Sequence, residues 1–124
     1  MIFDKNFLEE LLQQAAVAPR LRVNHDLRNS AADTSQRMLN ALAVGTEVSV
    51  HRHEDTAETV VCLCGKLVEI IYEQVDGCFV EQQRVLLCPA EGLHGMQVPA
   101  GAWHTIEVLE PSVIFEAKDG AYKG

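Results

Sequence analysis

The chain has 124 residues, with 10 Lys and Arg against 18 Asp and Glu, which gives a formal net charge of −8. This length fits one ordinary domain, and a hydrophobic share of 48% is enough to build a core. Because an acidic protein repels phosphate backbones and anionic lipids, we expect neither nucleic acid nor a membrane as a partner. The N-terminal residues lack the basic start and apolar centre of a signal peptide, so we expect a cytoplasmic protein.

Residues 4–18 predict a helix with Asp4 as its N-cap, since apolar residues recur along one face with helical spacing. Pro19 marks its end. We expect this helix to pack on the outside of a sheet domain. The predicted organisation is an N-terminal helix and irregular segment over 1–36, packed on a barrel over 37–124, in one structural domain.

Residues 20–36 read as an irregular polar segment that is locally basic in an acidic protein. Its basic side chains are Arg20, Arg22, His25 and Arg28. They fit either a solvated loop or a segment that folds over a pocket mouth and meets an anionic ligand.

From residue 37 to 118 the chain is rich in β-branched residues, and turn residues recur every eight to twelve positions. Asp76-Gly77 is a strong hairpin signal. Many short strands in one small domain indicate an all-β sandwich or barrel. The expected strands are 37–43, 46–53, 58–64, 67–75, 78–88, 94–98, 103–109 and 112–118.

Four side chains suggest a metal site. His51 and His53 alternate along an expected strand and therefore share a face, and Glu58 opens the next strand. His104 comes much later in the chain. Three imidazoles and one carboxylate suit one divalent transition metal such as Fe, Mn, Zn or Ni, and they do not suit Mg or Ca.

The spacing of these residues resembles the two signature motifs of the cupin superfamily. The first motif runs from Gly45 through His51-x-His53 and Glu58 to Gly65, and the second is Pro99-x-Gly101-x-x-His104. The second departs from the family pattern in the position of its first glycine and in Val108, where Asn is frequent. The resemblance implies a double-stranded β-helix, or jelly-roll barrel, with a metal in its mouth held by His51, His53, Glu58 and His104.

Four further segments look like the WbuC-type cupin-fold metalloproteins, small bacterial proteins encoded among genes for O-antigen and other surface polysaccharides. They are residues 37–42, His51-Arg52-His53, Trp103-His104-Thr105 and the ending 109–120. The helix followed by Pro19-Arg20 and the Asn24-His25 stretch also fit. Val50 stands where many members have proline.

Candidates for the pocket lining are less specific than the metal ligands. Arg37 and Asn40 lie on opposite faces of a regular strand, so at most one of them faces the pocket. Tyr72 either lines the pocket with its hydroxyl or packs in the core, and His25 belongs to the basic segment discussed above.

Three functions are compatible with these features. The first is a metal-dependent isomerase or epimerase acting on a sugar or sugar-derived metabolite in surface-polysaccharide biosynthesis. The second is an Fe(II)-dependent oxygenase that uses the same site, and the third is a non-catalytic module that binds a small molecule. No catalytic base beyond the four ligands is evident, so enzymatic activity is left open. A homodimer is compatible with the resemblance, because cupins are often dimers.

Overall fold

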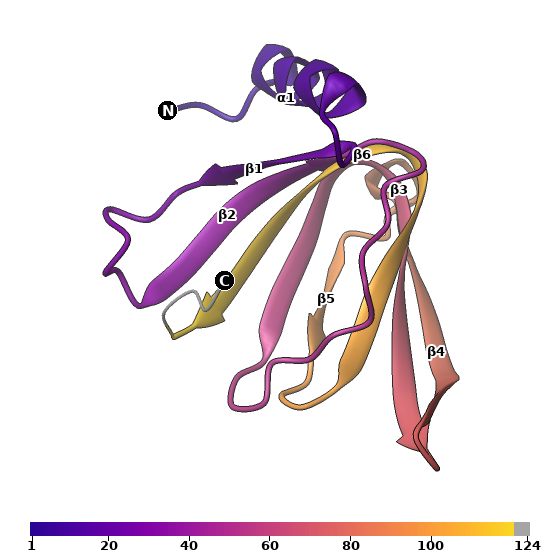
Figure 1. The fold of residues 1–124 in the computed structure, drawn as a ribbon. Helices are drawn as coiled ribbons and strands as arrows, with labels where there is room; N and C mark the ends of the chain where they lie inside the picture. Colours follow the sequence, from indigo (N-terminus) through magenta and orange to yellow (C-terminus); the bar gives the residue numbers. More distant parts are fainter. Residues whose placement is uncertain (121–124) are drawn as a thin grey trace.

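The computed structural model describes residues 1–120, which fold into one helix, a single sheet and a short 3₁₀ helix (Figure 1). In chain order the elements are α1 (Lys5–Val17), β1 (Arg22–Asp26), β2 (Ser35–Leu42), β3 (Glu58–Val75), β4 (Cys78–Leu87), η1 (Pro89–Glu91), β5 (Gly95–Val98) and β6 (Trp103–Asp119).

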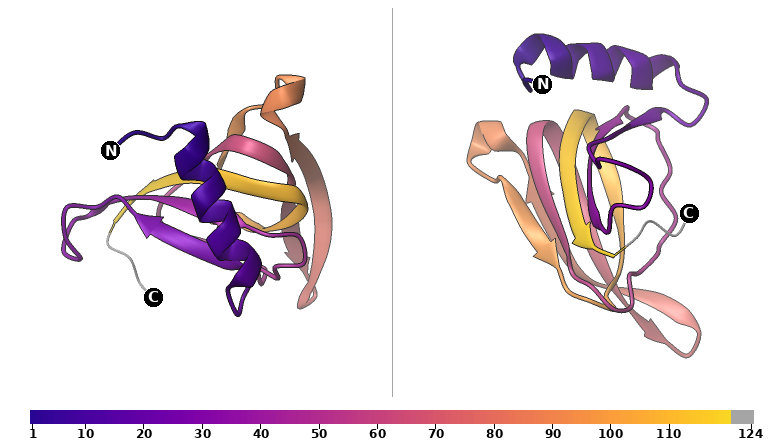
Figure 2. Two further views of the ribbon diagram at one scale, coloured as in Figure 1. Left: turned by 90° about the horizontal axis from the view of Figure 1, so that it is seen from above. Right: turned by 90° about the vertical axis from the view of Figure 1, so that its left-hand side faces the viewer.

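The sheet is antiparallel, with strand order β1-β2-β6-β3-β4 and with β5 paired to β3. The first half of β3 pairs with the second half of β6, and the second half of β3 pairs with the first half of β6. The two long strands bend sharply, so the sheet curls around its own interior (Figures 1 and 2). The expected all-β jelly-roll barrel with one N-terminal helix is confirmed.

A β-bulge around Gly65 produces the bend in β3. Pairing with β6 shifts register between Cys62 and Leu67, and Gly65 adopts a φ of 94°. Ser112 completes the hydrogen bonding of the bulge, because its hydroxyl accepts from the Lys66 amide at 2.9 Å and donates to the Glu110 carbonyl at 2.7 Å. A bulge adds one residue to one strand of a pair and increases its local bend and twist.

The bulge also exchanges the two faces of β3. Before it, Val60 and Cys62 point into the interior core, whereas after it Leu67 does. Inward positions therefore have even numbers in the first half of the strand and odd numbers in the second. The consequence is that Glu69 lines the interior pocket and Tyr72 does not.

Helix α1 begins after Asp4, whose carboxylate accepts from the Phe7 amide at 2.9 Å, as expected for an N-cap. Its apolar face packs on the outer surface of β2 and β6, against Leu39, Ala41 and Val113. Figure 2 shows the helix lying across the outside of the sheet. Among the described residues, no helix is long and apolar enough to cross a bilayer.

The structure differs from the strand predictions in three respects. Residues 46–53 form only an isolated bridge at His51, because this segment crosses the barrel mouth with little strand pairing. Residues 22–26, expected to be irregular, form the edge strand β1, whose mixed polar sequence carries no alternating pattern. Two continuous strands replace four predicted ones: β3 includes both 58–64 and 67–75, and β6 includes both 103–109 and 112–118. The reason is that bulges rather than turns occur at Gly65 and Pro111.

The Asp76-Gly77 hairpin is confirmed: both residues have positive φ, 50° and 80°, between β3 and β4. The last four residues of the expected 37–124 barrel lie outside the described residues.

We expect Gly65→Ala to destabilise the protein by more than about 2 kcal/mol. A Cβ at this position would meet the Pro111 carbonyl oxygen at 2.2 Å and would be held at a positive φ. The matched control is Gly77→Ala, which has a similar φ but no atom within 4 Å of the new Cβ, and it should cost only about 1 kcal/mol. Urea unfolding of both variants measures the difference, and equal losses would contradict this account of the bulge.

Candidate metal centre

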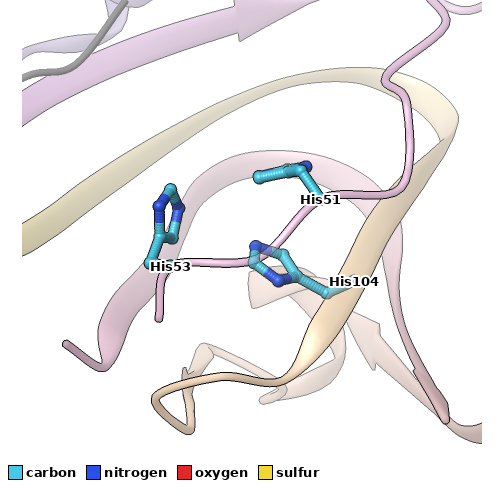
Figure 3. A group of neighbouring side chains, drawn as sticks. All are labelled: His51, His53 and His104. Carbon is cyan, nitrogen blue, oxygen red and sulfur yellow. The ribbon is translucent and has the colours of Figure 1, made fainter. Parts of the chain in front are cut away.

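Three imidazoles meet at the mouth of the barrel (Figure 3). His51 and His53 come from the segment between β2 and β3, and His104 lies at the start of β6. Each offers one ring nitrogen such that the three atoms lie within 4.8 Å of one another. The ring centroids of His51 and His104 are 4.3 Å apart, and His53 lies 5.3 and 5.6 Å from these two.

Backbone hydrogen bonds hold the histidine segment against β6. The amides and carbonyls of His51 and His104 bond reciprocally, at 3.0 and 2.8 Å, and the Gly101 amide donates to the His53 carbonyl at 2.7 Å. The Thr105 hydroxyl also donates to the Val48 carbonyl. The expected pairing of His51 and His53 on one side of the chain is therefore achieved by local docking rather than by a strand.

Two of the imidazoles have a defined tautomer. Nδ1 of His51 lies 2.9 Å from the Ser49 carbonyl, and Nδ1 of His104 lies 2.9 Å from the Ala102 carbonyl. A carbonyl only accepts, so each Nδ1 carries the hydrogen and each Nε2 keeps a lone pair. Metal-binding histidines typically have a hydrogen-bond acceptor at the nitrogen that faces away from the ion.

Glu58, the first residue of β3, is buried beside these rings. Its Oε2 lies 3.1 Å from His53 Nε2, and its Oε1 lies 3.7 Å from His104 Nε2. Burial favours a higher pKa for Glu58, but its polar contacts with His104 and Glu116 and the charges of His104 and His53 outweigh burial and lower the pKa. The four residues that the sequence suggested are thus brought together.

A second carboxyl, Glu116 of β6, lies against Glu58. Burial and the neighbouring Glu58 carboxylate raise the pKa of Glu116 well above its ordinary range, which favours its protonated form. Asn40 donates its side-chain amide hydrogen to Glu116. This acid pair could not be found from sequence, because Glu116 lies far from Glu58 along the chain and carries no motif.

A third inward carboxyl, Glu69 of β3, was also missed. It is 2% exposed, and its Oε2 has no hydrogen-bond partner among the described residues. Burial raises its pKa to about 7, with His104 opposing and Glu58 adding to the shift. The signal that would have revealed it is the bulge at Gly65, which turns Glu69 inward.

The pKa values of the histidines are not alike. Burial lowers those of His51 and His53 below the ordinary 6.5. Burial acts in the same direction on His104, but Glu58 and the Ala102 carbonyl outweigh it and raise its pKa. The lowered pKa values favour the neutral, lone-pair-donating forms of His51 and His53, whereas the raised pKa of His104 means that a proton competes more strongly with a metal for its Nε2.

The four predicted pocket residues lie in different places. Asn40 lines the cavity, whose volume is about 1130 Å³. Arg37 faces outward and binds the Asp33 carboxylate at 3.1 Å, because it alternates with the inward Asn40 and Met38. His25 lies outside the barrel, with its ring 5.4 Å from that of Phe7 on α1. Tyr72 packs beside Phe79, with ring centroids 6.1 Å apart, because the bulge turns it outward.

The basic side chains of residues 20–36 were expected either in a solvated loop or over a pocket mouth, and the structure shows some of them in each place. Arg20 and Arg22 line the cavity, and Arg22 also donates to the Glu47 carbonyl at 3.0 Å. Arg28 lies outside the cavity lining and binds Asp26 at 2.8 Å. Lys118 of β6 adds another cation to the lining. Arg20, Arg22 and Lys118 therefore place three cations in the cavity lining, together with the Asp119 carboxylate at the end of β6.

The buried donor set fits a metal ion. Nε2 of His53 and Nε2 of His104 are buried beside Glu58, but neither makes a hydrogen bond of suitable geometry among the described residues. Such groups each cost about 1–3 kcal/mol when left unsatisfied. An ion bound by these nitrogens and by Glu58 would satisfy them together. Three nitrogens and one oxygen match Fe, Mn, Zn or Ni.

We expect binding of Zn²⁺ to release more protons at pH 6.5 than at pH 8, because His104 has a pKa raised above 6.5 and must deprotonate to bind. Any free energy of unfolding that the ion adds should be present above about pH 7 and should decline as pH falls toward 5. At low pH the imidazoles of the unfolded protein and of the metal-free folded protein bind protons, which then compete with the ion. Calorimetry in two buffers of different ionisation enthalpy measures the protons, and melting with and without chelator measures the stability. Equal release at both pH values would contradict the assignment of His104.

Comparison with known proteins places this site in context. The family model described as "Domain of unknown function (DUF6016)" matches residues 3–86. No curated protein matches the chain.

Several solved structures share the fold. The TT1209 protein from Thermus thermophilus aligns with a TM-score of 0.67 and 23% identity over 96% of each chain. A cupin superfamily protein from Desulfitobacterium hafniense aligns with a TM-score of 0.61 and 20% identity, over 82% of this chain and 78% of that one.

The capsular polysaccharide assembling protein CapF from Staphylococcus aureus aligns with a TM-score of 0.64 and 20% identity. The alignment covers 86% of this chain but only 30% of CapF. The fold expected from the two motifs is thus confirmed, and the chain is a cupin-fold protein that belongs to the DUF6016 family.

Proposed function

We propose that this protein binds one divalent transition metal through His51, His53, Glu58 and His104. The observation that carries the proposal is the convergence of three ring nitrogens within 4.8 Å of one another, beside a buried carboxylate. Unpaired Nε2 atoms on two of the rings support it. The charge of such a site would be +1, from a divalent ion, three neutral imidazoles and one carboxylate.

We further propose that the site acts on a sugar or sugar-derived metabolite as an isomerase or epimerase. A bound ion would supply Lewis-acid polarisation of a carbonyl. The protein's own residues then position the substrate: Arg22 and Lys118 line one side of the cavity, and Asn40 presents an amide whose Oδ1 is unpaired. A lining with so many polar groups suits a hydroxyl-rich molecule better than an apolar one.

A role in surface-polysaccharide synthesis is supported by two resemblances. One is the similarity of the sequence to WbuC-type cupins, and the other is the fold shared with CapF, which is described as a capsular polysaccharide assembling protein.

We expect His53→Ala to lose most of its bound metal, measured by elemental analysis of protein purified without added metal. The variant lacks one of the four proposed ligands, so the remaining three should hold the metal more weakly. The matched control is His25→Ala, a histidine outside the barrel beside Phe7, which should keep the stoichiometry of the unaltered protein. Equal metal content in both variants would contradict the proposed centre.

The metal found in that experiment also separates the competing functions. Zinc would favour the Lewis-acid reaction and exclude the oxygenase, whereas iron with metal-dependent consumption of dioxygen would favour the oxygenase. If the protein binds a sugar but converts none of the sugars tested, the non-catalytic binding module would be favoured.

A further inference from the structure

Glu69 is a buried acid that neither the fold nor the proposed metal centre uses. It is 2% exposed, and its Oε2 has no hydrogen-bond partner among the described residues. Buried carboxyls in proteins are normally paired, because an unpaired one loses its hydration without compensation. A hydrophobic residue here would pack against Leu67 and Ile106 at less cost, so the acid needs another explanation.

Glu69 lies close to the proposed metal centre. In the pairing of β3 with β6, Glu69 lies opposite Ile106, two residues from His104 on the same inward face. Diagonal neighbours of this kind have Cα atoms about 7–8 Å apart. Glu69 and the three histidines line the same cavity, so a small molecule bound beside the imidazoles lies within reach of this carboxyl.

The chemistry of Glu69 selects the group that it binds. A carboxyl offers lone pairs, and its unpaired Oε2 has no donor among the described residues. A molecule bound in the cavity would supply the missing donor. A hydroxyl adjacent to the oxygen that faces the histidines is such a donor, because Glu69 and the histidines line the same cavity.

We propose that Glu69 is a substrate-binding residue, which accepts a hydrogen bond from a hydroxyl group next to a carbonyl or carboxylate bound at the histidine cluster. The ligand class is then a small α-hydroxy carbonyl or α-hydroxy carboxylate compound. This inference rests on the proposed metal centre and narrows its substrate. The burial that raises the pKa of Glu69 to about 7 also strengthens its hydrogen bonds.

The first test compares two probes that differ by one hydroxyl. Glycolate and acetate are titrated into Co²⁺-loaded protein at pH 8, and the visible spectrum of the cobalt reports binding. We expect the unaltered protein to prefer glycolate. In Glu69→Leu the ratio of the two affinities should fall by about tenfold, because a hydrogen bond to a charged group is lost.

Controls separate this role from others. Glu69→Gln keeps an acceptor of the same shape and should retain part of the preference, whereas Glu73→Gln, on an exposed position of the same strand, should retain all of it. Glycolate also chelates metals by itself, so only the change in the ratio between variants counts. An unchanged ratio in Glu69→Leu overturns the proposal, as does a failure of glycolate to bind the cobalt-loaded protein.

A second measurement distinguishes a structural role. Glu69→Leu should bind cobalt with the same stoichiometry and melt no lower than the unaltered protein, because the acid makes no contact that the fold needs. A lower melting point would show that Glu69 supports the structure, and it would overturn the inference. If no variant and no unaltered protein binds cobalt, the proposed metal centre itself fails, which is a different result from cobalt binding with an unchanged ratio.

Discussion

The organisation of this protein depends on polar side chains that point into the barrel. A small barrel is normally filled by apolar residues, and the lower part of this one is, through Leu42, Leu67 and Ile114. At the mouth, however, three imidazoles and three carboxyls face one another. Their charges oppose burial, and the two neighbouring carboxyls respond in opposite ways: the pKa of Glu58 is lowered, and that of Glu116 is raised.

The carboxyls divide into two kinds of environment. Glu58 and Glu116 form a pair supported by Asn40 and two imidazoles, so their cost of burial is shared. Glu69 has no such support among the described residues. Paired groups are compatible with a structural or metal-supporting role, whereas an isolated buried acid destabilises the fold. Proteins tolerate destabilised positions of that kind chiefly where function requires them.

The fold class and the four proposed ligands were predictable because both depend on short motifs. His51, His53 and Glu58 belong to one motif, the Asp76-Gly77 turn is a local signal, and His104 was found because residues 99–104 resemble the second cupin motif. The continuity of β3 and β6, the edge strand β1 and the inward acids were not predictable, because they depend on how distant segments pair. Tyr72 and Glu69 show this most clearly: strict alternation from Glu58 places Tyr72 inward, and only the extra residue at Gly65 reverses the assignment.

The bulge in β3 has a consequence for how this family can vary in length. Because side chains alternate with a period of two, deleting one residue near Gly65 would restore simple alternation from Glu58 onward and would remove the bulge that bends the strand. Leu67 and Glu69 would keep their inward orientation, but the strand would lose the local bend with which the sheet closes on its interior. Relatives should therefore accept insertions and deletions at the β3–β4 turn, where a Cβ on Gly77 would meet no other atom within 4 Å, while keeping the number of residues between Glu58 and Glu69 constant.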